Sequence, residues 1–242
     1  MAMRCDSGAL RLLSKHNRDI VFFMLVWLGL LAGGLTALWY ELILRPPQFD
    51  TAQEPDWEIF LPTVGILLTV TARVIQSLAA RAFTRLGVVH LFRSEISSLC
   101  RAIGSLHIAD SLTGFSPDSY SDFTSQSWSR RENYSQVFAN NTSGLADLPT
   151  QTVLDVTAFY TFFKTSRDAA QIMDGWSPNT TEQKMQDDVC RVMIQLRMCF
   201  EAARNALLEL ADEPDEVRTD LALIDQVTEK LSSSLERHGA SG

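Results

Sequence analysis

Few side chains of this sequence stand at spacings that could support acid–base, metal or nucleophilic chemistry. The histidines are His16, His90, His107 and His238, and the cysteines are Cys5, Cys100, Cys190 and Cys199. They form no His-x-x-x-His, Cys-x-x-Cys or mixed cluster of the kind that holds a metal ion. A glycine-rich phosphate loop and a nucleophile elbow are also missing. The sequence therefore predicts a protein that is not an enzyme and that uses no metal or cofactor.

Two acidic pairs, Asp187-Asp188 and Asp212-Glu213, could supply carboxylates for acid–base work. Adjacent residues on a helix point apart, so we expect these side chains to lie on solvated faces. An enzyme whose active site lies between facing side chains inside a helical bundle is one of three functions considered, and the other two are given at the end of this section. The Glu-x-x-His motif that discriminates such sites does not occur.

None of the cysteines stands in a Cys-x-x-Cys pair, and the compartment inferred below from the distribution of charge is reducing. Cys190 and Cys199 fall within an apolar helical pattern, which predicts small residues of the core. Cys5 could be a lipidation or redox site, and its role stays open.

One polar group falls in a segment that is otherwise apolar. Thr69, Arg73 and Gln76 share one face of a predicted helix over residues 57–80. An arginine near the end of a membrane helix can extend its side chain to the lipid headgroups. The alternative is that the three side chains form a polar stripe that lines a pore or the interior of a helix bundle.

The elements that position these groups begin with residues 20–40, which carry no charge. A helix of about 20 apolar residues spans the hydrocarbon core of a bilayer. A signal peptide would have a shorter apolar region and a small-residue cleavage site, whereas this run ends at Trp39 and Tyr40, which suit a membrane interface. Residues 57–80 form the second predicted span, with Pro62 in its first turn. Together they predict a transmembrane hairpin over residues 20–80, with an outer loop over 41–58.

A stripe of small residues runs along the first span at one-turn spacing: Gly29, Gly33 and Ala37. Such stripes let helix backbones approach closely in a membrane. The sequence leaves open whether this packing joins the two spans or two protomers.

Charge is spread unevenly along the chain, whose net charge is −8. Basic residues predominate before the first span (1–19) and after the second (81–101), and acidic residues predominate in the outer loop. The positive-inside rule then places both termini in the cytoplasm of a multi-pass protein of the inner (plasma) membrane, in contact with the lipid bilayer. Acidic residues outnumber basic ones after residue 101, which argues against a nucleic-acid partner.

The remainder of the chain predicts a helical bundle over residues 81–237, with a frayed tail over 238–242. The pattern of the second span continues without a stop signal to about residue 106, so we expect one long helix. Residues 110–131 read as a loop, and helices follow over 134–141, 149–174, 181–211 and from Pro214 onward. The third of these carries a heptad seam: Val189, Met193, Leu196, Phe200, Ala203, Leu207 and Leu210. The predicted fold is all-α, a two-helix transmembrane hairpin followed by a cytoplasmic antiparallel helical bundle.

Residues 138–160, FANNTSGLADLPTQTVLDVTAFY, resemble a family of uncharacterised bacterial membrane-anchored helical proteins. Those proteins carry one or two N-terminal spans and a motif Y-x-x-N-x-x-x-L-G-x-L-P followed by V-x-x-F-Y. The matching positions are Phe138, Asn141, Leu145, Leu148, Pro149, Val156, Phe159 and Tyr160. Ala146 stands in place of the usual glycine. The resemblance implies the same architecture and no particular activity.

The residues of this motif also predict a structural role. Asn141 and Gly144 suit a left-handed helix cap, and Pro149 suits the first turn of the next helix. We therefore expect a helix–turn–helix corner, with Phe159 and Tyr160 packed beneath it.

Layout and charge together favour a membrane-tethered helical module that binds itself or a protein partner. The alternative is an oligomeric channel or a membrane-perturbing effector, built from the hairpin through the stripe at Gly29 and Gly33 and the polar face at Arg73.

Overall fold

The computed structural model of the chain describes residues 17–40, 57–105, 108–116, 136–173, 175–177 and 179–239. Within these residues all regular secondary structure is helical, as predicted. The predicted outer loop 41–58 lies almost entirely outside them, as does Cys5. The chain divides into two compact units, residues 1–86 and 87–242, and the division falls within helix α3 (Trp57–Ser105).

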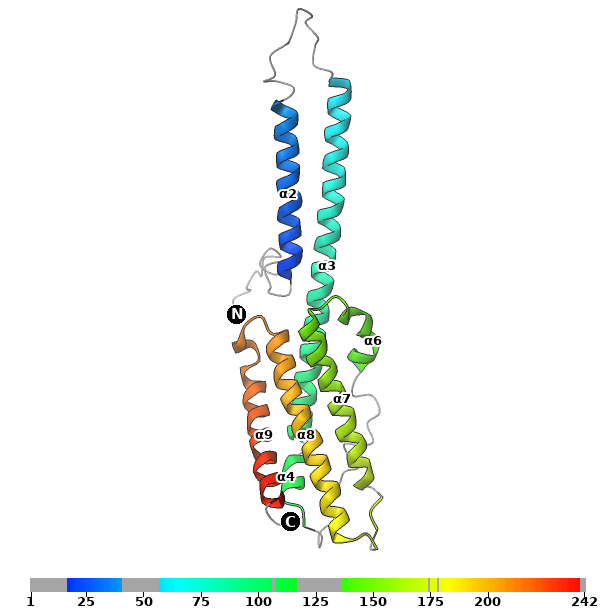
Figure 1. Cartoon of the computed structure of the whole chain (residues 1–242), viewed down its shortest axis with the longest axis vertical. Coiled ribbons are helices and arrows are strands. Elements are labelled where there is room, and N and C mark those ends of the chain that lie inside the picture. Colours follow the sequence, from blue (N-terminus) through cyan, green and yellow to red (C-terminus); the bar gives the residue numbers. More distant parts are fainter. Residues whose placement is uncertain are drawn as a thin grey trace, which may run out of the picture. The chain divides into compact units, whose positions relative to one another are not determined.

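The first unit contains α2 (Arg18–Trp39) and the first half of α3, which run in opposite directions (Figure 1). The Arg85 guanidinium pairs with the Asp19 carboxylate at 2.8 Å, and Gly34 lies against Leu67. Residue numbers that rise along α2 thus fall along α3. The antiparallel hairpin arises because each helix has a row of partly buried side chains at helical spacing, and the two rows face each other. The row on α2 includes Met24, Trp27 and Leu31.

Both helices of this unit are long and apolar enough to cross a membrane, in the windows Arg18–Ala37 and Leu61–Gly104. Most of their large apolar side chains are exposed, for example Phe22, Leu30 and Ile66 at 62–66%. A soluble domain would bury such residues, since burial of a large apolar side chain stabilises by about 1.5–3 kcal/mol. Pro62 lies within the first two turns of α3, where the lost backbone donor matters little.

The predicted long helix is present: α3 continues without a break to Ser105. From Val88 onward its apolar face enters the core of the second unit, through Val89, Phe92, Ile96 and Ile103. The same helix therefore offers exposed apolar side chains in the first unit and buried ones in the second.

The second unit is a bundle of α3, α7 (Thr150–Met173), α8 (Glu182–Leu210) and α9 (Arg218–Gly239). Helix α8 packs between α7 and α9 (Figure 1). All members of the predicted heptad seam of α8 are buried: Val189, Met193, Leu196, Phe200, Ala203, Leu207 and Leu210. A seam buried along nearly the whole of one helix makes α8 the centre of the core.

The directions of these helices differ from the predicted antiparallel bundle. Helix α8 is antiparallel to both neighbours (Figure 1). On its α7 side, Gln195 bonds Thr165 and Asp188 bonds Trp176, so residue numbers that rise along one helix fall along the other. Helices α3 and α9 instead run in the same direction. Their contacts rise together in residue number, with Arg93 on Glu216 and Arg101 on Asp220. It follows that α7 also runs parallel to α3. The prediction was wrong because α3 and α7 are joined by a long connection, which includes α4 and α6, and long crossovers permit parallel neighbours.

Three local predictions also need correction. Residues 110–113 of the expected loop belong to the short helix α4 (Ile108–Thr113), whose Leu112 is fully buried. The segment from Pro214 begins with the 3₁₀ turn η4 (Pro214–Glu216) before α9 starts. Helix α6 (Gln136–Leu145) is kinked at Asn141, whose φ of −124° and ψ of 21° are neither helical nor left-handed.

Gly144 is required because α6 approaches α3 closely at this position, and not because the chain turns there. A Cβ atom at this position would lie 2.8 Å from Cγ2 of Val88 on α3, a distance that real Cβ atoms do not adopt. The absence of a side chain therefore lets α6 pack directly against α3.

We expect Gly144→Ala to destabilise the bundle by about 1–3 kcal/mol, because the stiff valine cannot move aside. The double variant Gly144→Ala with Val88→Ala should recover most of the loss. Gly87→Ala serves as the control, since a Cβ there meets no atom within 4 Å. Urea unfolding of the full chain in detergent micelles measures these effects, and equal losses in the single and double variants would contradict this role.

Candidate functional site

A polar depression in the bundle lies between α3 and the start of α9. Its volume is about 520 Å³, which is within the range of small-molecule sites. It is lined by His90, Arg93, Ser94, Ser97, Ser98, Arg101, Glu216, Val217 and Asp220. We call it the α3–α9 pocket.

The residues of α3 reach this pocket because they recur at helical spacing. His90, Ser94, Ser97 and Arg101 follow one another at steps of three and four, which places them on one face. The opposite face of the same stretch carries the apolar residues that enter the core. Glu216 and Asp220 stand four apart and meet this face from η4 and α9.

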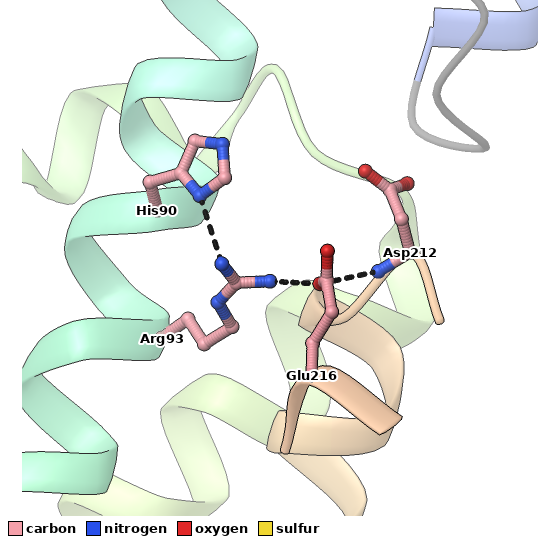
Figure 2. A network of polar contacts seen from close by, with 4 residues as sticks. All are labelled: His90, Arg93, Asp212 and Glu216. Carbon is pink, nitrogen blue, oxygen red and sulfur yellow. Dashed lines mark hydrogen bonds and ion pairs between the residues drawn. The ribbon is translucent and has the colours of Figure 1, made fainter. Parts of the chain in front are cut away.

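A chain of polar contacts closes one end of the pocket (Figure 2). One terminal nitrogen of Arg93 pairs with Oε2 of Glu216, and the other lies 3.2 Å from Nδ1 of His90. The same Glu216 oxygen accepts a hydrogen bond from the backbone N–H of Asp212 at 3.3 Å. Arg93 is thereby fixed between two helices.

A second arginine is fixed at the other end. Nε of Arg101 donates to Oδ1 of Asp220 at 2.6 Å, and Asp220 is nearly fully buried. The Asp220 carboxylate raises the pKa of Arg101, so this guanidinium stays charged. The pocket thus holds two positioned guanidinium groups beside three serine hydroxyls, a donor-rich set that can bind a polar group.

Sequence reasoning did not single out this pocket. The polar stripe His90–Arg101 could have been found by its helical period, but the partners at Glu216 and Asp220 follow only from the fold. Among the described residues no cluster of three metal-ligating side chains occurs.

The family-motif residues are brought together around a residue that sequence reasoning missed. Glu95 on α3 accepts hydrogen bonds from the backbone N–H groups of Val137 at 2.8 Å and Phe138 at 3.2 Å. It also accepts one from the hydroxyl of Tyr160. A carboxylate on another helix therefore satisfies the first turn of α6, where free N–H groups and the helix dipole favour negative charge.

Aromatic rings surround this carboxylate, as the expected corner requires. The rings of Phe138 and Tyr160 stack at 4.2 Å, and Phe159 meets Tyr160 edge-on at 5.0 Å. Phe92 of α3 contacts both members of the stack. The remaining motif residues complete the corner: Leu145 and Leu148 are buried, and the carbonyl of Pro149 accepts the first hydrogen bond of α7. Asn141 donates to the carbonyl of Val137 within α6.

Burial and the nearby Glu95 carboxylate raise the pKa of the Tyr160 hydroxyl far above its ordinary value. Folding therefore keeps Tyr160 protonated where an unfolded tyrosine ionises, near pH 10. The corresponding stability is complete below about pH 10 and is lost as pH rises further.

We expect the native chain and the Tyr160→Phe variant to form the same number of tyrosinates at about pH 11, measured by absorbance at 295 nm. After unfolding in urea, the unmutated chain should form one more. A native difference between the two would show that Tyr160 ionises in the fold.

The candidate residues of the spans lie away from the interface of the hairpin. A Cβ atom added at Gly29 or Gly33 would meet no atom within 4 Å, and Ala37 is exposed. Gly34, not the predicted stripe, faces α3. Thr69, Arg73 and Gln76 are also exposed, and the Thr69 hydroxyl donates to the carbonyl of Gly65 at 2.7 Å. Packing between protomers through the stripe stays a prediction.

The predicted core cysteines and the predicted solvated residue Asp188 differ from one another in burial. Cys199 is buried as expected and Cys190 is half-buried, while burial raises the pKa of the Cys100 and Cys199 thiols. Asp188 was expected on a solvated face, but it is buried and accepts a hydrogen bond from the indole of Trp176 at 3.2 Å.

Comparison with protein-family models, curated proteins and solved structures finds no match in any of the three.

Proposed function

We propose that this chain is a membrane-tethered interaction module. Its N-terminal hairpin anchors it in the inner (plasma) membrane with both termini in the cytoplasm. Its helical bundle binds a protein partner, either a second copy or a different protein. The single observation that carries this proposal is the contrast in exposure along α3, which is apolar and exposed before residue 80 and enters a packed core after residue 87.

Exposed apolar side chains on α7 and α8 support the partner-binding role. The hydrogen bond between Thr165 and Gln195 places these helices side by side. Their exposed large apolar residues are Leu154, Ile172, Ile194 and Met198, each at least 37% exposed. Neighbouring apolar side chains on a solvated face are typical of surfaces that contact other proteins, and Ile194 and Met198 stand one turn apart on α8.

Native mass spectrometry of the gently solubilised protein from its own cells tests this proposal. The expected result is a fixed stoichiometry with itself or with a second protein. The variant Ile194→Glu with Met198→Glu should lose the complex, while Ser233→Glu on α9 should retain it. A monomer alone, or complexes that are unaffected by the α8 variant, would contradict the proposal.

A second candidate function is an oligomeric channel or a membrane-perturbing effector. It is favoured by the open space at Gly29 and Gly33 and by the exposure of the polar side chains at Thr69, Arg73 and Gln76. This role predicts ion conductance or dye release in liposomes that Arg73→Leu alters and Arg81→Leu does not. Liposomes that stay sealed at high protein density would exclude it.

A further inference from the structure

We propose that the α3–α9 pocket binds a phosphate group, either on a soluble molecule or on a lipid headgroup. The binding groups are the guanidinium of Arg101 and the hydroxyls of Ser94, Ser97 and Ser98. Arg93 supports the same site from the far end of the pocket. This inference is independent of the partner-binding function proposed above.

Arg101 is held in place by a single buried carboxylate, that of Asp220. Asp220 accepts from Nε alone, and the fold buries that carboxylate so that only 5% of the side chain is exposed. A guanidinium is planar, so fixing Nε also fixes the direction of its two terminal nitrogens. These nitrogens have no hydrogen-bond partner among the described residues, and the Arg101 side chain is 62% exposed. Arg101 therefore offers oriented, solvent-facing donors, the arrangement that recognises phosphate oxygens.

The serine hydroxyls that line the pocket are available to a ligand. Within the part of the chain that the structure describes, Ser94, Ser97 and Ser98 make no side-chain hydrogen bond, although each could donate to the carbonyl four residues earlier. Three threonines on the same helix do so: Thr69, Thr71 and Thr84, at 2.7–3.0 Å. The pocket serines thus keep their donors available, and Ser97 does so although the residue is buried, with 9% of its surface exposed.

The charged side chains of the pocket include both signs. Glu216 and Asp220 balance the two arginines, so the pocket is not a region of strong positive charge. An incoming phosphate would be bound through geometry and hydrogen bonds rather than through bulk attraction. Binding should accordingly be weak for inorganic phosphate and only mildly sensitive to salt, in contrast to an exposed basic patch.

The test uses the full chain in maltoside micelles, which contain no phosphate, and measures the unfolding temperature during a titration with inorganic phosphate. Chloride at equal ionic strength is the reference. The expected result is a saturable rise with phosphate and none with chloride, because a ligand that binds only the folded state stabilises it.

Two variants assign the effect to the pocket. Ser97→Ala with Ser98→Ala should weaken the apparent Kd about tenfold or more, since hydrogen bonds to a charged ligand are lost. Its matched control is Ser232→Ala with Ser233→Ala on α9, whose hydroxyls bond to backbone carbonyls of their own helix. Arg101→Lys keeps the charge beside Asp220 but removes the planar fork, with Arg197→Lys as its control, and should weaken phosphate binding similarly. An equal response to phosphate and chloride, or unchanged phosphate binding in both pocket variants, would overturn the proposal.

Nanodiscs with phosphatidic acid distinguish the two sources of the phosphate. If the ligand is a headgroup, this lipid should raise the unfolding temperature and reduce the response to inorganic phosphate, but only while the pocket serines are present. If the ligand is soluble, the lipid should leave the phosphate titration unchanged. Both results support a phosphate site, and they identify where the phosphate comes from.

Discussion

Replacement of Glu95 by alanine is expected to destabilise the bundle by about 3 kcal/mol, through the loss of one carboxylate that serves three donors. The backbone N–H groups of Val137 and Phe138 and the hydroxyl of Tyr160 would lose their acceptor at once. Unpaired donors in a partly buried site cost more than the average hydrogen bond contributes, because they also lose contact with water.

The effect should be concentrated at α6. Hydrogen exchange of the full chain in micelles should show faster exchange throughout α6 in the Glu95→Ala variant, with α8 unaffected. Glu201→Ala is the matched control, because Glu201 forms an exposed pair with Arg197 one turn away, and such pairs contribute about 0.5 kcal/mol or less. If Glu95→Ala and Glu201→Ala lost equal stability in urea unfolding, Glu95 would not be the anchor of α6.

Replacement of Phe200 by alanine should have the largest effect of any single change, about 3–5 kcal/mol. Phe200 is fully buried in the middle of the α8 seam, so its removal leaves a cavity that the neighbouring helices cannot fill. Urea unfolding followed by circular dichroism gives the loss directly. Ile194→Ala on the exposed side of the same helix is the control and should cost less than about 1 kcal/mol. Similar losses at the two positions would contradict the assignment of the seam to the core.

Much of this architecture could be predicted because it follows from the sequence patterns of residues that are close together in the chain. The uncharged run before Tyr40 and the unbroken periodicity of α3 each depend on residues that are close in sequence. The α8 seam is equally local, and every one of its predicted positions is buried.

The parts that could not be predicted depend on partners that are distant in sequence. Glu95 stands alone on α3, and no local signal connects its carboxylate to the start of α6. Gly144 suggested a turn because glycine is common in turns, but its role is the close approach to Val88. The parallel course of α3 and α9 likewise depends on long connections, which leave no periodic signal.

The α3–α9 pocket could have been predicted only in part. Its α3 side could have been found as a polar stripe through His90, Ser94, Ser97 and Arg101. Its other side could not, because an acidic residue near a helix start is usually explained by the helix dipole alone. Only the fold pairs Glu216 with Arg93 and Asp220 with Arg101.

The central proposal is that the hairpin crosses the membrane and leaves the bundle in the cytoplasm. The most direct test is to label cysteines on cells with a maleimide that reaches the outer face of the plasma membrane but cannot cross it. Single cysteines are introduced at Gln53, in the proposed outer loop, and at Ser233, on an exposed position of α9, in a variant whose four native cysteines are replaced by alanine. The account predicts that Gln53→Cys is labelled on intact cells, whereas Ser233→Cys is labelled only after permeabilisation. Labelling of Ser233→Cys on intact cells, or protection of Gln53→Cys until the membrane is opened, would contradict it.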